Sequence, residues 1–163
     1  MSDDPIKDAL QRMPYGFYSI SSKNGDDVNA MVANWVVQVS FSPRLIALGL
    51  AKKAYTRGVI EAGRVFAVNI FNREDKDALL LFSKGRARNP EKMAGAGFTS
   101  GPETGCPIVD GAAAYVECRV KEIVDVGGDH VIVVGEAVNA AILKEGEVSD
   151  TLTLPDLGWS YAG

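Results

Sequence analysis

The segment from Asn29 to Thr56 constrains the fold of this chain more than any other. It contains a long run of strand-forming and small residues, the pair Ser42-Pro43, a short apolar run and a basic loop. Proline removes a ladder donor and restricts the residue before it, so this pair should separate two strands, at about 28–39 and 45–50. The second run is apolar on both faces, which is typical of a strand buried on two sides. Another subunit is one way to cover the second side.

Hairpin signals predict antiparallel pairing of the strands. Asn24-Gly25 favours a tight turn with positive φ angles, so the first two strands should be antiparallel neighbours. Further strands are expected at 65–70, 114–120 and 131–138. In the run 114–120 the even-numbered residues should point inward, and Tyr115, Glu117, Arg119 and Lys121 outward. Six or seven such strands with short helices predict a mainly β fold, a small antiparallel barrel, rather than a doubly wound sheet.

Short helices should complete this barrel. They are expected near residues 6–12, 55–62 and 72–84. Thr56 is a plausible N-cap of the second helix, and Gly63 a plausible left-handed residue at its end. The stretch 87–110 is irregular and rich in glycine and proline, which indicates a long excursion from the barrel.

Composition excludes several classes of function. The length of 163 residues fits one domain over residues 1–163, and a net charge of -4 argues against nucleic-acid binding. No apolar run approaches the roughly 20 residues that cross a bilayer, so we expect a cytoplasmic protein without a membrane partner. His130 is the only histidine, and the two cysteines lack zinc spacing. We therefore expect no metal, and any redox chemistry needs an organic cofactor.

The segment 29–56 suits a flat ligand with a phosphate tail. Small residues around Asn34 let a planar ring approach the backbone, although an ordinary strand with a buried Trp35 explains them too. A buried asparagine amide wants polar partners, which favours a site. The loop 52–56 brings two lysines and a hydroxyl to a helix start, where a phosphate is favoured. A solvated loop is the alternative.

Other polar positions leave two interpretations open. Ser40 either caps a strand end or bonds a ligand, and His130, beside Asp129, is either a turn residue or faces a cofactor. Two local basic patches are either solvated surface or anion sites. The first patch comprises Arg44, Lys52, Lys53 and Arg57, and the second Lys84, Arg86, Arg88 and Lys92.

Taken together, several motifs resemble the flavin reductase-like, FMN-binding split-barrel family, over roughly Ala9 to Val138. Met13-Pro14-Tyr15-Gly16 resembles its entry into the first strand, and residues 29–43 resemble its flavin-contact strand. Residues 51–60 are similar to its phosphate-side loop and helix. Phe66-Ala-Val-Asn-Ile and Gly128-Asp-His-Val-Ile-Val-Val-Gly-Glu complete the set. The second strand and the ending Leu157-Gly-Trp-Ser-Tyr are similar to flavin reductase domains of rubredoxin-type and flavodiiron electron-transfer proteins.

This resemblance implies a six- or seven-stranded antiparallel split β-barrel that forms a homodimer with FMN near the interface. It implies an NAD(P)H-dependent FMN reductase that transfers hydride from NADH or NADPH to FMN, with FAD a possible substitute. Electrons would pass to a partner oxygenase or redox protein, and His130 would orient the nicotinamide. The implied flavin contacts are Ala33, Asn34, Trp35, Val36, Ser40, Gly49, Leu50, Ala51, Lys52, Lys53, Ala54, Tyr55 and Thr56, with Lys84 and Arg88 as secondary candidates.

Two alternatives use the same barrel. One is an FMN-carrying electron-transfer flavoprotein without its own nicotinamide activity. The other is a non-catalytic module that binds FMN or haem, although His130 is the only candidate for an axial haem ligand.

Overall fold

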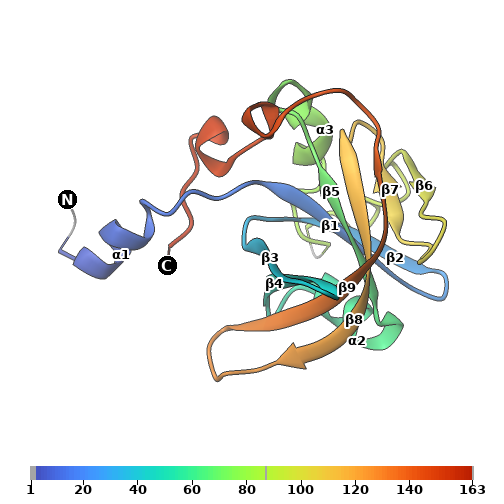
Figure 1. Cartoon of the computed structure of the whole chain (residues 1–163), viewed down its shortest axis with the longest axis horizontal. Coiled ribbons are helices and arrows are strands. Elements are labelled where there is room, and N and C mark those ends of the chain that lie inside the picture. The colour runs from blue at the N-terminus through green and yellow to red at the C-terminus, as the bar shows by residue number, and fades with distance from the viewer. Residues whose placement is uncertain (1–2, 87, 163) are drawn as a thin grey trace.

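One seven-stranded antiparallel sheet organises the computed structural model, which describes residues 3–86 and 88–162 (Figure 1). Its strands follow the order β2-β1-β5-β8-β9-β4-β3. A separate two-stranded hairpin, β6 and β7, lies in the excursion that was predicted to be irregular. The strands are β1 (Tyr18–Asn24), β2 (Asp27–Ala33), β3 (Val36–Phe41), β4 (Arg44–Ala51), β5 (Val65–Ile70), β6 (Phe98–Ser100), β7 (Pro107–Val109), β8 (Ala114–Val124) and β9 (His130–Ile142).

The predicted strand 28–39 is two strands, and its division closes the sheet. β2 and β3 lie at opposite edges of the sheet, yet only Asn34 and Trp35 connect them. In a flat sheet the six spacings between these edges would add up to about 29 Å. The three Cα steps from Ala33 to Val36 cover at most about 11 Å. The sheet must therefore curl into a barrel, with a seam at residues 34 and 35.

The barrel interior and one outer face carry separate cores. Inside, Ile20, Leu48, Phe66 and Val133 are completely buried and come from four different strands. Ile60 of α2 joins this cluster. The other core forms outside the barrel around Phe71, where Leu79 of α3, Phe82, Met93 and the segment 152–154 cover β2. The second core supports one side of the seam.

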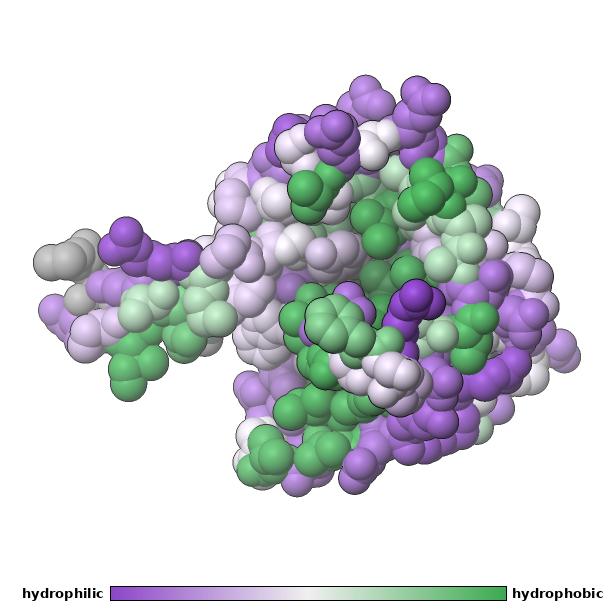
Figure 2. All heavy atoms as spheres, in the orientation of Figure 1, coloured by the Kyte–Doolittle hydropathy of each residue, from purple (hydrophilic) through white to green (hydrophobic). Residues whose placement is uncertain are grey.

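The helices are short and lie around the barrel: α1 (Pro5–Leu10), α2 (Tyr55–Gly63) and α3 (Lys76–Leu80), with 3-10 turns at Arg73–Asp75, Val148–Asp150 and Leu154–Leu157. None of the helices in residues 3–86 and 88–162 is long and apolar enough to cross a membrane. α1 projects from the body of the molecule, and the C-terminal segment lies near its base (Figures 1 and 2). The third predicted helix is shorter than expected.

Both predicted caps of α2 were wrong. Ala54 occupies the N-cap position, and Thr56 is a buried helical residue whose hydroxyl accepts a hydrogen bond from Asn29. Arg64, with φ of 60°, takes the left-handed conformation instead of Gly63. Gly63 is needed for another reason, because a Cβ there would collide with the carbonyl oxygen of Lys23.

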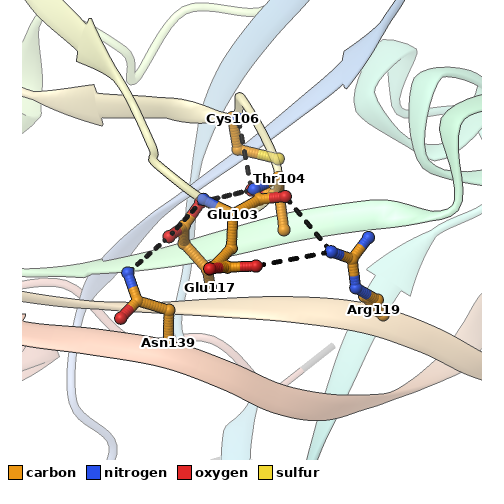
Figure 3. Close-up of polar contacts among 6 residues, drawn as sticks. All are labelled: Glu103, Thr104, Cys106, Glu117, Arg119 and Asn139. Atoms are coloured by element: carbon orange, nitrogen blue, oxygen red, sulfur yellow. Dashed lines mark hydrogen bonds and ion pairs between the residues drawn. The ribbon is translucent and has the colours of Figure 1, made fainter.

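Tyr115 and Glu117 point to a covered face of β8, contrary to the predicted outward orientation. The excursion that contains β6 and β7 covers this face, so both side chains are buried. Glu117 has no exposed surface, and its carboxylate accepts hydrogen bonds from Thr104, Glu103 and Asn139 (Figure 3). Burial acts to raise the pKa of Glu117, but these hydrogen bonds outweigh it and hold the pKa below 4.5. The ionised carboxylate therefore ties the excursion to the barrel.

Glu117→Gln should test this tie. The substitution keeps the size of the side chain but removes its charge and one acceptor oxygen. We expect the free energy of unfolding at pH 7 to fall by about 2–3 kcal/mol, since hydrogen bonds to a charged group contribute about 1.5–3 kcal/mol. Glu122→Gln, on an exposed position of the same strand, is the matched control and should change it by less than about 0.5 kcal/mol.

The effect should depend on pH with a defined sign. Because the folded-state pKa of Glu117 lies below 4.5, its contribution is complete above that pH and is lost as the pH falls through the folded-state pKa. Urea unfolding at several pH values should show the difference between wild type and Glu117→Gln shrinking below pH 4.5. A difference that stays constant on acidification would contradict an ionised Glu117.

Candidate functional site

A cavity of about 240 Å³ opens at the seam of the barrel. Its floor comes from β2, β4 and the two linking residues, and its roof from the C-terminal segment. We name it the seam cavity. It is lined by Phe17, Met31, Val32, Ala33, Asn34, Trp35, Gly49, Ala51, His130, Leu154, Trp159, Ser160 and Tyr161.

Three aromatic rings form one wall of the seam cavity. The ring centroid of Trp35 lies 4.7 Å from that of His130 and 4.9 Å from that of Tyr161. Gly49 of β4 lets the indole approach the strand, because a Cβ at that position would come within 3.0 Å of it. Trp159 meets the opposite wall, 5.6 Å from Phe17 and perpendicular to it. A flat apolar group fits between these walls.

A chain of hydrogen bonds fixes the imidazole of His130. Its Nδ1 lies 2.6 Å from Asp129 Oδ1, and its Nε2 lies 3.1 Å from the hydroxyl of Tyr161. The hydrogen bond with His130 lowers the pKa of Asp129. Both ring nitrogens therefore have partners, and the ring presents a defined orientation to the cavity.

Asn34, which lines the seam cavity, carries an unpaired donor. The residue is only 8% exposed, and its Nδ2 has no hydrogen-bond partner among the described residues. A buried donor without a partner costs about 1–3 kcal/mol, so such a group is expected to meet an acceptor on a bound molecule.

A second cavity, of about 220 Å³, continues along β2. It shares Met31 and Val32 with the seam cavity, and Asn29 and Asn34 lie five residues apart on this path. That separation spans about 16 Å of strand. We name this second cavity the basic cavity. Its lining comprises Asn29, Met31, Val32, Ala54, Tyr55, Thr56, Phe82, Ser83, Gly85, Arg86 and Lys92.

Lys92 gives the basic cavity a buried positive charge. It is 6% exposed, and its Nζ donates to the carbonyl oxygen of Lys84 at 3.3 Å. In the described part of the chain, no carboxylate lies within ion-pair distance of this ammonium group. Burial lowers the pKa of Lys92, and the nearby Arg86 lowers it further. An anion is the ligand that this environment lacks.

Asn29 and Thr56 complete the polar lining of the basic cavity. The Nδ2 of Asn29 donates to Thr56 Oγ1 at 2.7 Å, which leaves the threonine hydroxyl proton available to the cavity. Asn29 is 1% exposed, and its Oδ1 has no hydrogen-bond partner among the described residues. This oxygen can accept a hydrogen bond from a hydroxyl group.

The structure brings most of the predicted site residues together. The seam cavity gathers Ala33, Asn34, Trp35, Gly49, Ala51 and His130, and the basic cavity gathers Ala54, Tyr55 and Thr56. Val36 and Leu50 pack in the barrel core. Ser40 is half-buried beside a bulge in β3, at the end of that strand away from the seam.

The predicted basic contacts lie elsewhere. Lys52 forms an ion pair with Asp125 at 2.8 Å, and Lys53 is exposed. The side chains of Lys84 and Arg88 are exposed too. None of these four residues is among the described residues that line the two cavities.

Several residues of the two cavities were missed from sequence. Asn29 and the tail residues Trp159 and Tyr161 carried no recognisable spacing. Arg86 and Lys92 belonged to the second basic patch, which left a solvated surface equally open. The one available signal was the absence of acidic partners near Lys92 other than Glu91.

Comparisons with known proteins agree with this fold. The family model described as the flavin reductase like domain matches residues 10–156. The high molecular weight rubredoxin of Moorella thermoacetica is 36% identical over 141 residues, 85% of this chain and 61% of that protein. The chain thus spans about three fifths of the length of that relative.

Two further similarities cover most of both chains. The ferric-chelate reductase (NAD(P)H) of Archaeoglobus fulgidus is 32% identical to this chain over 143 residues. These residues cover 86% of this chain and 83% of that protein. The solved structure of the NADH:FAD oxidoreductase SgcE6 of Streptomyces globisporus is 26% identical, with a TM-score of 0.77 over 87% of each chain.

Proposed function

The chain belongs to the flavin reductase like domain family, and we propose that it binds FMN and transfers hydride to it from NADH or NADPH. The predicted family, its rubredoxin-type branch and the mainly β barrel are confirmed. The electrons then pass to a partner oxygenase or redox protein. The ferric-chelate reductase and the NADH:FAD oxidoreductase named above support this reaction class.

The order of polar groups along β2 and the link that follows it, with Lys92 beside the strand's outer end, carries the proposal. An unpaired amide donor at Asn34 suits a carbonyl or ring nitrogen of the isoalloxazine. An unpaired acceptor at Asn29 suits a ribityl hydroxyl, and the buried ammonium of Lys92 suits the phosphate. The path between these groups is comparable in length with an extended FMN. The residues present therefore fit this cofactor.

The two cavities divide the cofactor between them. We place the ring in the seam cavity, against residues 33–36, Gly49 and His130, and the phosphate in the basic cavity, near Thr56, Arg86 and Lys92. This moves the phosphate from Lys52 and Lys53, because Lys52 is paired with Asp125. Lys84 and Arg88 stay proposed as secondary contacts for the phosphate or the nicotinamide.

When bound, FMN supplies the redox chemistry, because its ring accepts a hydride and releases electrons. The protein contributes position and electrostatics. His130, held by Asp129, would orient the nicotinamide, and the Asn34 amide would stabilise negative charge on the ring. Trp159 and Tyr161 exclude water from the seam cavity. The hydride step requires no protein acid or base.

An apolar surface supports a homodimer. Val37 and Val39 of the edge strand β3 are 58% and 51% exposed, and Phe41 is 88% exposed. Val138 of β9 adds to this surface, and Figure 2 shows hydrophobic side chains gathered over β3, β4 and β9. An exposed apolar edge strand is typical of an interface between chains. We propose that two copies pair through this face.

A second candidate function is that of an FMN-carrying electron-transfer protein. The tail that roofs the seam cavity favours it, because a nicotinamide needs access to the ring that the tail covers. The similarity to a rubredoxin supports a role in electron transfer as well.

Anaerobic titration with NADH and NADPH separates the two functions. Purified protein loaded with FMN should lose the flavin absorption band within seconds of adding either nucleotide. The same loaded protein without nucleotide is the control for photoreduction. A flavin that remains oxidised with both nucleotides would overturn the reductase and favour the electron carrier.

Lys92→Met should weaken the binding of FMN and spare that of riboflavin. Methionine keeps the length and apolar stem of the side chain but removes the ammonium group. A lost hydrogen bond to a charged phosphate costs about 1.5–3 kcal/mol, which raises the dissociation constant of FMN about 10- to 150-fold.

Riboflavin, which lacks the phosphate, serves as the internal control in the same fluorescence titration. The double variant Lys52→Ala plus Lys53→Ala should leave the affinity for FMN within about threefold of wild type, which corresponds to less than about 0.7 kcal/mol. The reverse pattern would return the phosphate to the loop 52–53.

Val39→Glu should disrupt the proposed dimer. It places a charge on the apolar face of β3, and truncating or charging a central interface position raises a dimer dissociation constant about 30-fold or more. Sedimentation velocity measures the effect. Val148→Glu changes a residue that is 90% exposed outside the sheet and is the matched control. A wild-type chain that sediments as a monomer would refute the dimer.

A further inference from the structure

Three side chains from separate segments meet at the outer end of the basic cavity. Tyr55 begins α2, Asp27 begins β2, and Arg86 lies in the segment after α3. The hydroxyl of Tyr55 donates to Asp27 Oδ2 at 2.8 Å, and Arg86 Nη1 lies 3.1 Å from Asp27 Oδ1. The guanidinium carbon of Arg86 stands 4.5 Å from the centroid of the Tyr55 ring. We name this group the clamp.

The clamp holds Arg86 from three directions. Besides Asp27 and the Tyr55 ring, its Nη1 donates to the carbonyl oxygen of Val28 at 3.0 Å. The hydrogen bond with Asp27 raises the pKa of Tyr55, so the phenol remains a neutral donor at pH 7. The stacked phenol and guanidinium therefore form a fixed rim around the end of the basic cavity, of which both residues are part.

The charges of this rim differ between its inner and outer sides. Lys92 lies inside the cavity and has no carboxylate partner in the described part of the chain. Asp27 bonds to both rim residues, Tyr55 and Arg86, but is not part of the described cavity lining, so we infer that it lies behind them. A phosphate that ends at Lys92 meets positive charge, whereas a chain that continues outward meets the carboxylate of Asp27. Such a repulsive element discriminates between ligands that share one binding group.

We propose that the clamp of Asp27, Tyr55 and Arg86 selects a terminal phosphate monoester, and therefore FMN, over FAD. In FAD the same phosphate continues into a second phosphate and an adenosine, which would have to displace the stacked pair and pass Asp27. This inference rests on the proposed function, because it assumes that the flavin phosphate lies in the basic cavity.

Flavin-binding titrations of the full chain test the clamp. The fluorescence of FMN and of FAD, measured separately against wild type, Asp27→Ala and Asp26→Ala, gives six dissociation constants. Wild type should bind FMN at least about tenfold more tightly than FAD. Asp27→Ala should reduce this ratio at least about fivefold, mainly by tightening FAD. Asp26→Ala removes the same charge from the neighbouring exposed position of the turn and should leave the ratio unchanged.

Tyr55→Phe provides a second variant that keeps the ring beneath Arg86. It removes the hydrogen bond to Asp27, so it should shift the ratio in the same direction by a smaller factor. A wild type that binds both flavins equally would overturn the inference while leaving the proposed reductase intact. Equal weakening of both flavins in Asp27→Ala would also overturn it, because Asp27 would then only position Arg86. A chain that takes up neither flavin would overturn the proposed function itself.

Discussion

The two-residue link between β2 and β3 is the constraint on which the rest of the structure depends. It joins the outermost strands of the sheet, so the sheet must close, and closure creates both the interior core and the seam. The linking residues lie outside both strands, although the carbonyl oxygen of Trp35 still accepts a hydrogen bond from the backbone N–H of Gly49 at 2.9 Å. Asn34 and Trp35 are therefore held at a place where the backbone leaves the sheet, and the seam cavity forms around them. The site is a product of how the barrel closes.

The site continues from the seam along β2, from the seam cavity to the basic cavity. Its residues pass from an apolar, aromatic cavity to a polar one with a buried ammonium group. Burying Lys92 without a carboxylate opposes folding, and the lowered pKa of its ammonium group reflects that cost. Groups of this kind persist when a ligand offsets them. The unpaired atoms of Asn29 and Asn34 carry a similar cost, since each atom is buried and each residue lines one of the two cavities.

Local patterns predicted the elements, and long-range contacts decided their partners. The Asn24-Gly25 hairpin, β4, α2 and β5 were predicted because turn residues and apolar runs report local backbone preference. The division of the strand at residues 34 and 35 was not, because strand propensity indicates an extended backbone and says nothing about which neighbour it pairs with. Glu117 was placed on the wrong face because alternation identifies two faces without showing which is covered.

The same difference between local patterns and long-range contacts explains which site residues were predicted from the sequence. Asn34 and His130 were proposed as site residues because a buried amide in a predicted strand needs polar partners and because His130 is the only histidine in the sequence. The charge of Lys92 was not assigned to the site, since its burial depends on how the segment 81–97 folds against β2 and α2. Tyr161 lies 31 residues from His130, and no local rule connects the two.

The tail over the seam cavity has an energetic consequence. Its polar contacts include the hydrogen bonds from Gln11 to Ser160 and between Tyr161 and His130, both exposed. Exposed bonds of this kind contribute about 0.5–1.5 kcal/mol each. If the proposed reductase activity holds, a hydride donor that displaces the tail would use a comparable part of its binding free energy for this opening, which would raise its apparent dissociation constant by roughly one to two orders of magnitude. The strength of the tail contacts would therefore set the NADH or NADPH concentration that the proposed reductase needs for turnover.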